Sequence, residues 1–324
     1  MITTPSSELA GKRILVTGAS GFIGSHLCRS LTSTGAEVHG VSRIPRTGVE
    51  KGLRWWRGDL ADPAIVRKLI STVKPEMIFH LAAGDTRANR DVNLVLPIFK
   101  DNLSTAVNVL TAATETGCGR IVLAGSLDEP EPGAPPSSPY AAAKVAIQAY
   151  AQLFHRIFQM PVVVARMFMA YGPGQEAVQK LIPYVTLCLL QGQSPKLSSG
   201  QRLVDWIYID DLVDGLTALA QAPDVEGSTV DLGSGLLVTV RAVVQELVRL
   251  TGSTAEPVFG AVQERPMEQL RTAKVNETYS QTGWKARTSL EKGLSQTIDW
   301  YRARLTSEIS SGKRKARAWR VSGA

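Results

Sequence analysis

The sequence has few of the residues that mark secreted, metal-binding or membrane proteins. It holds three cysteines and four histidines among 324 residues, and Cys28, Cys118 and Cys188 show no spacing typical of a disulfide framework or a metal site. No apolar run is long enough to cross a bilayer, and the first residues lack the pattern of a signal peptide. We therefore expect a cytoplasmic protein with reduced thiols, no bound metal and no membrane partner.

Acidic residues are also in the minority. The chain has 36 Lys and Arg against 29 Asp and Glu, which gives a net charge of +7 and a pI near 9.4. Much of the excess lies in Lys313–Arg320, and a terminal run of this kind is typical of a solvated tail. We expect residues 306–324 to form a flexible basic tail. We expect no nucleic-acid partner, because that interpretation would depend on this segment alone.

Short β-branched runs alternate with longer amphipathic stretches through the first half of the chain. This alternation is typical of parallel strands joined by right-handed crossover helices, so it predicts an α/β fold with a doubly wound parallel sheet, the Rossmann fold. The expected strands are 13–17, 37–42, 53–57, 77–80, 120–124 and 162–167, and the expected helices are 22–34, 63–73, 94–116 and 140–158.

The strict alternation fades in the second half of the chain. There we expect a helix around 177–190, an extended segment at 205–209 and a helix at 211–221. The sequence therefore predicts a dinucleotide-binding domain over 1–172 and a smaller C-terminal substrate domain over 173–305, partly interleaved with the first.

A glycine-rich turn follows the first expected strand. The segment Gly18-Ala-Ser20-Gly21-Phe22-Ile23-Gly24 leads from that strand into the first expected helix. Gly18 allows the tight turn, Gly21 lets the backbone approach a pyrophosphate, and Gly24 lets helix and strand pack closely. The helix N-terminus then presents its N–H groups to the phosphates. A glycine turn without a ligand is the alternative, but the strand–turn–helix context favours a dinucleotide site.

The end of the second expected strand indicates which dinucleotide binds. NAD-binding proteins place Asp or Glu there for the ribose hydroxyls, whereas this chain has Ser42-Arg43, followed by Arg46. A hydroxyl and guanidinium groups favour a 2′-phosphate, so we expect NADP(H) to be preferred, with NAD(H) possible. The alternative interpretation is that Arg43 is only a solvated loop residue.

Asp59 and Leu60 follow the third expected strand, where they are placed to contact the adenine ring. Asp59 would hold the adenine amino group. The alternative for Asp59 is a helix N-cap, but Asp62 suits that task better because it directly precedes the next helix.

Tyr140 and Lys144 lie one turn apart in an expected helix, so their side chains share one face. A lysine ammonium beside a phenol stabilises the phenolate and lowers the pKa of the phenol, which suits proton transfer near neutral pH. Such pairs also occur by chance on solvated helices. Downstream of a dinucleotide motif, and behind a strand that leads to Ser126, the pair predicts catalysis.

Together these segments resemble the extended short-chain dehydrogenase/reductase family, which contains NAD(P)-dependent nucleotide-sugar epimerases, dehydratases and reductases. The resemblance runs from about residue 12 to residue 301, and it is specific for the family but not for the substrate. Its motifs are Thr17–Leu27, Gly58–Leu60, Phe79–Ala83, Asn102, Ser126, Tyr140 with Lys144, Arg166–Gln175, Asp205–Asp211 and Gly283–Lys285.

The resemblance implies a role for each matching residue. Ser126 would hydrogen-bond the oxygen at the reacting carbon, Tyr140 would transfer the proton, and Lys144 would bind the nicotinamide ribose and tune Tyr140. The residues that would line the cofactor are Leu81, Ala82, Ala83 and Asn102.

The substrate side departs from the family pattern. Residues 181–183 and Arg265 match nucleotide-sugar contacts, although Arg265 is equally well interpreted as a surface arginine. Met169 stands where the family commonly has an asparagine, and a thioether cannot replace an amide at a diphosphate oxygen. Val204 replaces a family arginine, but Arg202 points the same way on an extended segment and could take over the diphosphate contact. The identity of the base therefore stays open.

The residues after Ser126 argue against one reaction of the family. Dehydratases need a hydroxyl followed directly by an Asp-Glu pair, but here the order is Ser126-Leu127-Asp128-Glu129, so one group is missing in either register. Asp128 is a candidate substrate contact. Otherwise Asp128 and Glu129 are expected to be solvated residues that open the following proline-rich loop.

We expect NADPH-dependent reduction of a 4-keto deoxysugar nucleotide, with the proton from Tyr140 and polarisation by Ser126. An NAD(P)-dependent 4-epimerase is the alternative. A non-catalytic NADP-binding sensor is a distant one, which the intact Ser126, Tyr140 and Lys144 disfavour. The long helices 94–116 and 140–158 imply, through the resemblance, a homodimer with a four-helix interface, unless they only cover their own sheet.

Overall fold

The computed structural model describes residues 8–46, 52–84, 91–264 and 270–310. Arg265 and the basic segment 311–324 lie outside the described residues. The described part divides into two compact units, each considered by itself below. Unit 1 comprises Met1–Phe168, Val213–Leu232 and Lys274–Lys285, and unit 2 comprises Met169–Leu212, Gly233–Ala273 and Ala286–Ala324.

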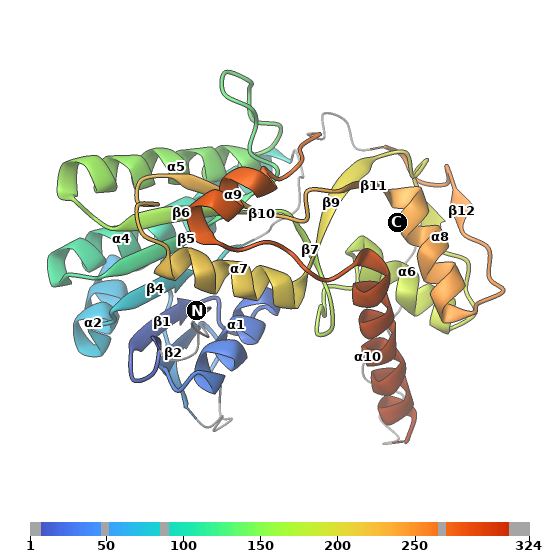
Figure 1. Ribbon diagram of the computed structural model, residues 1–324, viewed down its shortest axis with the longest axis horizontal. Coiled ribbons are helices and arrows are strands. Elements are labelled where there is room, and N and C mark those ends of the chain that lie inside the picture. Colours follow the sequence, from blue (N-terminus) through green and yellow to red (C-terminus); the bar gives the residue numbers. More distant parts are fainter. Residues whose placement is uncertain (1–7, 47–51, 85–90, 265–269, 311–324) are drawn as a thin grey trace. The chain divides into compact units, whose positions relative to one another are not determined.

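Unit 1 is built on a parallel sheet of seven strands (Figure 1). The strand order β3-β2-β1-β4-β5-β6-β10 reverses direction between β1 and β4, as a doubly wound sheet requires. The α/β Rossmann fold is thus confirmed. The strands are β1 (Arg13–Thr17), β2 (Glu37–Ser42), β3 (Leu53–Arg57), β4 (Met77–His80), β5 (Arg120–Ser126), β6 (Val162–Met167) and β10 (Thr229–Leu232).

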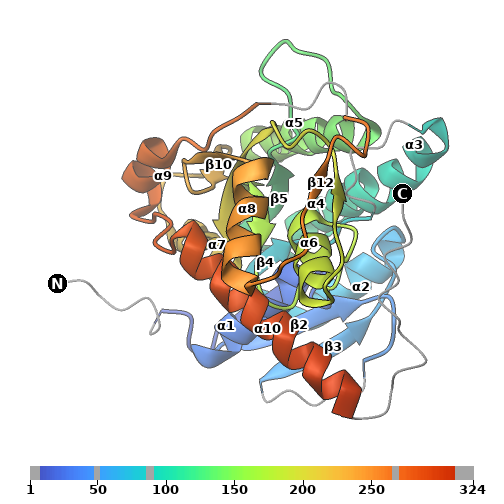
Figure 2. The same ribbon diagram turned by 90° about the vertical axis from the view of Figure 1, so that its right-hand side faces the viewer.

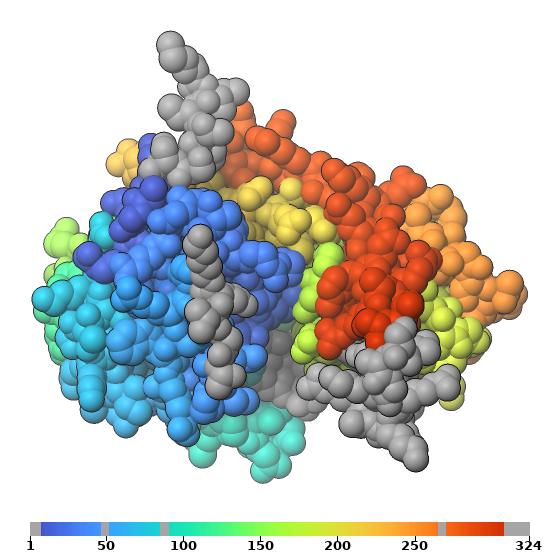
Figure 3. Space-filling model, turned by 90° about the horizontal axis from the view of Figure 1, so that it is seen from below, coloured from blue at the N-terminus to red at the C-terminus, as the bar shows by residue number. Residues whose placement is uncertain are grey.

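Helices cover both faces of this sheet, and Figure 2 shows the two layers on either side of the strands. One layer contains α2 (Pro63–Val73), α4 (Thr105–Thr116) and α5 (Pro139–Phe158), whose apolar sides share one buried core with strand residues such as Ile78 and Ile121. The other layer contains α1 (Phe22–Ser33), α7 (Ile209–Gln221) and α9 (Val275–Thr282). Figure 3 shows the N-terminal part of unit 1, blue to cyan, as one continuous surface.

Local signals determine where the helices of the site begin. Asp62 accepts hydrogen bonds from Ala64 N and Ile65 N at the start of α2, and Ser138 accepts one from Ala141 N at the start of α5. Proline follows each cap, where its missing N–H is not needed. Ser138 therefore sets the rotation that brings Tyr140 and Lys144 to the inner face of α5, where both are buried.

The single helix expected over 94–116 is not formed as one regular helix. The chain forms η1 (Val92–Leu94), α3 (Val95–Ile98), the π-helical segment η2 (Phe99–Ser104) and then α4. Thr105 Oγ1 lies 3.1 Å from Asp101 O and 3.0 Å from Asn102 O, so its hydroxyl satisfies carbonyls in the wide turn.

The described residues of unit 2 form two small sheets and three helices that lie wholly within the unit. One sheet joins β11 (Leu237–Thr239), β9 (Leu203–Tyr208) and β7 (Met169–Tyr171), and the other joins β12 (Val258–Phe259) and β8 (Lys196–Leu197). The helices are α6 (Leu181–Leu190), α8 (Val240–Thr251) and α10 (Leu290–Ser310).

The two units do not follow a single cut at residue 172, because Val213–Leu232 and Lys274–Lys285 belong to unit 1. Helix α10 reaches Ser310, beyond the expected start of a tail at residue 306. Among the described residues, no helix is both long enough and apolar enough to span a membrane.

Candidate active site

The glycine turn after β1 has the close contacts that its pattern predicts. Gly18 adopts a left-handed φ of +67°, and a Cβ on it would lie 2.8 Å from Ala82 N. A Cβ on Gly24 would lie 2.1 Å from Gly18 O. Side chains are therefore excluded at both positions, which lets α1 approach the end of β1.

The N-terminus of α1 fits the phosphates of a dinucleotide. Gly21 is the N-cap and has no side chain to accept the helical N–H groups. Ser20 is exposed, and Phe22 and Ile23 are half-buried in the first turn. The backbone N–H groups of the first turn and the positive end of the helix dipole are thus accessible to a phosphate, because Gly21 has no side chain to cover them.

Arg43 and Arg46, at the end of β2, are already engaged by neighbouring side chains. Arg43 Nη1 lies 3.3 Å from Asp101 Oδ2, and the Arg43 side chain is 64% exposed. The Arg46 guanidinium lies 5.9 Å from the centre of the Trp55 ring. Ser42 is buried, and its hydroxyl accepts a hydrogen bond from Ile44 N at 3.2 Å.

Asp59 lies in a turn and does not cap α2, since Asp62 takes that role. Asp59 Oδ1 accepts a hydrogen bond from Ala61 N at 3.1 Å, and Lys100 Nζ lies 3.7 Å from Asp59 Oδ2. Leu60 is buried in the core of unit 1.

A buried histidine connects the loop Leu81–Ala83 to the π-helical segment. Ala82 N donates to Thr17 Oγ1 at 3.1 Å, and Thr17 Oγ1 lies 2.9 Å from His80 Nδ1. His80 Nε2 lies 3.3 Å from Thr105 Oγ1. Burial, helped by the charge of Lys144, lowers the pKa of His80 to about 3, so the ring is neutral.

These contacts determine the tautomer of His80. Thr105 has one hydroxyl proton and directs it to a backbone carbonyl, so its oxygen accepts a hydrogen bond from His80 Nε2–H. Nδ1 then accepts a hydrogen bond from Thr17. The result is one directed chain of hydrogen bonds from the loop after β4 to the start of α4.

Asn102 lies within the π-helical segment and is buried. Its side-chain Nδ2 donates to Ile98 O at 3.1 Å, while Oδ1 has no hydrogen-bond partner among the described residues. An unsatisfied buried amide oxygen in a functional region fits a ligand or water donor.

Ser126, Tyr140 and Lys144 come together at the carboxyl end of β5. The Ser126 side chain lies beside Tyr140, close enough to lower the pKa of the phenol against the effect of burial. Lys144 Nζ donates to Ala124 O at 2.7 Å and lies 5.5 Å from the centre of the Tyr140 ring. Ser126 Oγ also accepts a hydrogen bond from Asp128 N at 3.2 Å.

The expected effect of Lys144 on Tyr140 is not the dominant one. Burial raises the pKa of Tyr140 above its ordinary range, and the hydrogen bond with Ser126 only opposes that shift. Burial also lowers the pKa of Lys144 to about 8, against the attraction of Glu129. Both groups are almost fully enclosed, so desolvation is the largest influence on each pKa, and the phenol is in its neutral form.

The expectation of a solvated Glu129 is wrong. Glu129 is 1% exposed, whereas Asp128 is half-buried. Glu129 Oε2 forms an ion pair with Arg166 Nε at 2.8 Å. Arg166 lies in the otherwise apolar strand β6, and a buried arginine requires a carboxylate partner, so the sequence did contain a signal that Glu129 turns inward.

The candidate substrate residues of unit 2 lie at strand ends. Met169 begins β7, and Arg202 is half-buried directly before β9, while Val204 is buried within it. Hydrogen bonds from Ser199 lower the pKa of Glu264, and the charge of Arg202 contributes to that shift. Arg202 therefore lies near an acidic group.

Comparisons with known proteins identify the family. A model of the NAD dependent epimerase/dehydratase family matches residues 14–233. A dTDP-glucose 4,6-dehydratase from Actinoplanes sp. is 30% identical over 319 residues, which cover 90% of this chain and 98% of the relative. The human dTDP-D-glucose 4,6-dehydratase is 26% identical, with 90% of each chain covered.

Solved structures agree with this assignment. The UDP-glucose 4-epimerase of Thermotoga maritima, solved with UDP-glucose, is 25% identical with a TM-score of 0.82, covering 90% of this chain and 99% of its own. MoeE5, solved with UDP-glucose and NAD, is 29% identical with a TM-score of 0.80 and the same coverage. This chain belongs to the NAD-dependent epimerase/dehydratase family, whose members are enzymes of the extended short-chain dehydrogenase/reductase type.

Proposed function

We propose that this enzyme reduces the 4-keto group of a deoxysugar nucleotide. The observation that carries this proposal is the position of the Ser126 side chain beside Tyr140, a buried phenol whose pKa is raised by its burial. Tyr140 donates its proton to the substrate oxygen, and Ser126 hydrogen-bonds the same oxygen and orients it. A bound nicotinamide cofactor supplies the hydride.

Lys144 holds the cofactor in this proposal. Its ammonium has three N–H donors, one of which is directed to Ala124 O. The remaining donors suit the hydroxyls of the nicotinamide ribose. Leu81, Ala82 and Ala83 pass along the cofactor, next to Gly18.

NADP(H) is the proposed cofactor, with NAD(H) as the alternative. Ser42, Arg43 and Arg46 offer a hydroxyl and two guanidinium groups at the end of β2 for a 2′-phosphate. Asp101 competes for Arg43, since the two side chains are 3.3 Å apart. The presence of NAD in the MoeE5 complex supports the alternative.

A 4-epimerase is the second candidate function. It is supported by the T. maritima UDP-glucose 4-epimerase, which has a TM-score of 0.82 to this chain. Epimerisation needs Tyr140 to accept a proton first and to return it later. The raised pKa keeps Tyr140 protonated at neutral pH, whereas the first step of epimerisation needs the phenolate, so reduction is the first proposal.

Dehydration is not proposed, although the relatives named above are dehydratases. The position of its side chain beside Tyr140 supports Ser126 as the hydroxyl of the site. Leu127, buried in the core, then takes the place of the acid that would follow it. Asp128 is a candidate contact for the sugar, and Arg202 is the candidate for the diphosphate.

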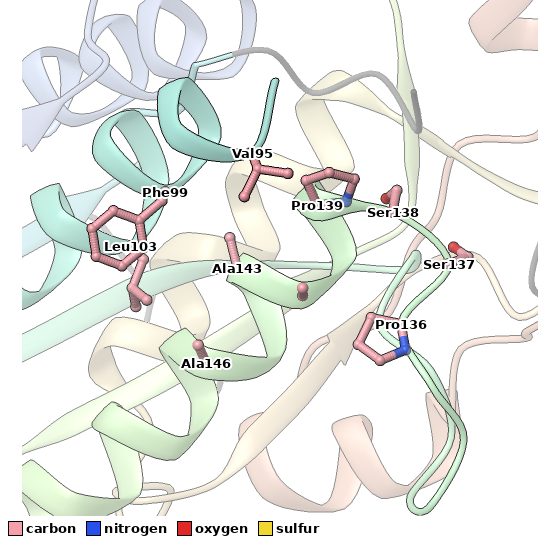
Figure 4. A pocket seen from close by; sticks show the side chains of 10 residues that line it. Val95, Phe99, Leu103, Pro136, Ser137, Ser138, Pro139, Ala143 and Ala146 are labelled. Carbon is pink, nitrogen blue, oxygen red and sulfur yellow. The ribbon is translucent and has the colours of Figure 1, made fainter. Parts of the chain in front are cut away.

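We also propose a homodimer through the outer faces of α3, η2 and α5. A groove of about 570 Å³ lies between these segments, and Figure 4 shows Val95, Phe99 and Leu103 facing Ala143 and Ala146. Large apolar side chains are exposed along η1, α3, η2 and α5, namely Val92, Val95, Leu96, Phe99, Tyr150, Leu153, Ile157 and Phe158. Such a surface suits burial against a second copy, which sedimentation would detect as a two-chain species.

We propose that the protein is located in the cytoplasm. No disulfide joins the three cysteines, all of which lie in the described ranges. Reduced thiols are usual in that compartment.

The reaction is tested with the purified enzyme and UDP- or dTDP-linked 4-keto-6-deoxy sugars. We expect consumption of one NADPH per sugar, with a higher kcat/KM for NADPH than for NADH. Arg43→Ala should reduce that preference. Interconversion of two 4-hydroxy sugar nucleotides without consumption of added NADPH would overturn the reductase proposal in favour of the epimerase.

A further inference from the structure

A chain of buried charged groups lies beneath the carboxyl end of β5. Glu129 Oε1 accepts a hydrogen bond from Ser126 N at 2.7 Å. Its Oε2 accepts from Arg166 Nε at 2.8 Å, and Gln148 Nε2 donates to the same oxygen. Both oxygens of this carboxylate are thus occupied within unit 1.

This series of contacts between charged groups continues across the sheet to the start of α9. Arg166 Nη1 lies 2.8 Å from Asp231 Oδ1 on β10. Asp231 Oδ2 accepts from Lys274 N at 3.1 Å, and Thr278 Oγ1 donates to Asp231 O at 2.8 Å. These contacts therefore connect Ser126, through β6 and β10, to Lys274–Lys285, the last segment of unit 1.

Glu129 is poorly placed to be an acid or base for substrate. Its side chain is 1% exposed and that of Arg166 is 17% exposed. Buried ion pairs carry a large desolvation penalty and are often replaceable by apolar residues of similar size. A network of this kind is therefore weak evidence for stability alone, and its geometry indicates another task.

We propose that Glu129 is a positioning residue, which holds the backbone of Ser126 so that the Ser126 hydroxyl meets Tyr140 and the substrate oxygen. The proposal depends on the role of Ser126 in the proposed function. A charge-assisted hydrogen bond from the amide fixes the end of β5. A displacement of about 1 Å at a reacting group can reduce the rate by about a hundredfold, so a rigid anchor has a direct effect on turnover.

Glu129→Gln is the first test, because it keeps the shape and removes the charge. We expect kcat to fall by about 10- to 100-fold, while the KM for the sugar nucleotide and the Kd for NADPH stay within about twofold. Gln148→Met is the milder second variant. It loosens Glu129 but leaves the pair with Arg166, so we expect a loss of kcat of about threefold with normal folding.

The control is an ion pair at the opposite, amino end of β5. Arg120 Nη2 lies 2.7 Å from Glu226 Oε1, with the Arg120 side chain 11% exposed. Glu226→Gln should lower the unfolding midpoint without changing kcat. An unchanged kcat in both Glu129→Gln and Gln148→Met, or a kcat loss in Glu226→Gln as large as that in Glu129→Gln, would overturn the proposal.

Amide hydrogen exchange at Ser126 tests the anchor without any turnover. We expect exchange at this amide to be at least tenfold faster in Glu129→Gln than in the wild type, with Val122 in the middle of β5 unchanged. Unchanged exchange at Ser126 would contradict the anchor itself. Absence of turnover in the wild type with every sugar nucleotide would instead contradict the proposed function and leave this measurement decisive.

Discussion

The two ends of strand β5 carry the same kind of interaction with different surroundings. At the amino end, Arg120 pairs with Glu226 and donates to Ala222 O at 2.9 Å. At the carboxyl end, the pair of Glu129 and Arg166 adjoins Ser126, Tyr140 and Lys144. In parallel sheets the carboxyl ends of the strands form the binding crevice. An ion pair at that end can therefore act on chemistry, whereas the one at the amino end acts on stability.

The largest contrast should come from Tyr140→Phe. This change removes the proton donor at the carboxyl end but keeps the buried ring, so we expect turnover to fall by at least about 10³-fold. NADPH affinity, measured by fluorescence titration, should change by less than about twofold. Loss of cofactor binding would show that Tyr140 has a structural role, and the contrast between the strand ends would then disappear.

The pH dependence of turnover should show the charge of Lys144. Burial lowers the pKa of this ammonium to about 8, so its positive charge is present below that pH and lost above it. We expect kcat/KM to fall by about tenfold per pH unit above about pH 8. An arginine keeps its charge at all these pH values, so Lys144→Arg, although slower, should not show the fall of kcat/KM above pH 8. The same fall in both proteins would mean that another group causes it.

His80, at the carboxyl end of the neighbouring strand β4, should make the stability of the protein depend on pH. Its pKa is lowered to about 3 from the ordinary 6.5. Between pH 6.5 and pH 3 the unfolded chain binds a proton at His80 that the folded protein does not bind. The contribution of His80 to the free energy of unfolding is therefore fully present above pH 6.5 and is lost as the pH falls towards 3. Relative to His80→Gln, the wild type should lose about 2 kcal/mol of unfolding free energy between pH 7 and pH 5.

Urea unfolding at both pH values measures this difference. His155→Gln is the matched control, since His155 is a half-buried histidine at the end of α5. Parallel pH curves for the wild type and His80→Gln would contradict a neutral His80 in the folded protein.

Periodicity and turn chemistry predicted most of unit 1, because its central strands, such as β1 and β5, are apolar runs buried on both faces. Strand β10 escaped prediction because it is short and carries Asp231, which looks like a loop residue until Arg166 is placed beside it. The single helix expected over 94–116 missed the π-helical segment, since extra residues in a turn leave the apolar pattern nearly unchanged.

The candidate site shows the same limit. Gly18, Gly24, Tyr140 and Lys144 were predictable from local spacing, because each depends on neighbours in the sequence. The burial of Glu129 and the directed bonds of His80 depend on partners far along the chain, such as Arg166 and Thr105. Arg265 lies outside the described residues, and its role stays a prediction.

The interleaving of the two units restricts how this enzyme can be divided. A fragment ending near residue 172 would lack β10, so β6 would become an exposed edge and Arg166 would lose Asp231. Two segments of unit 2, Met169–Leu212 and Gly233–Ala273, are therefore insertions between obligatory pieces of unit 1. Under the proposed function, new specificities would arise by exchange of those inserted segments, whereas end-to-end fusion of two separately folding halves would not reproduce this architecture.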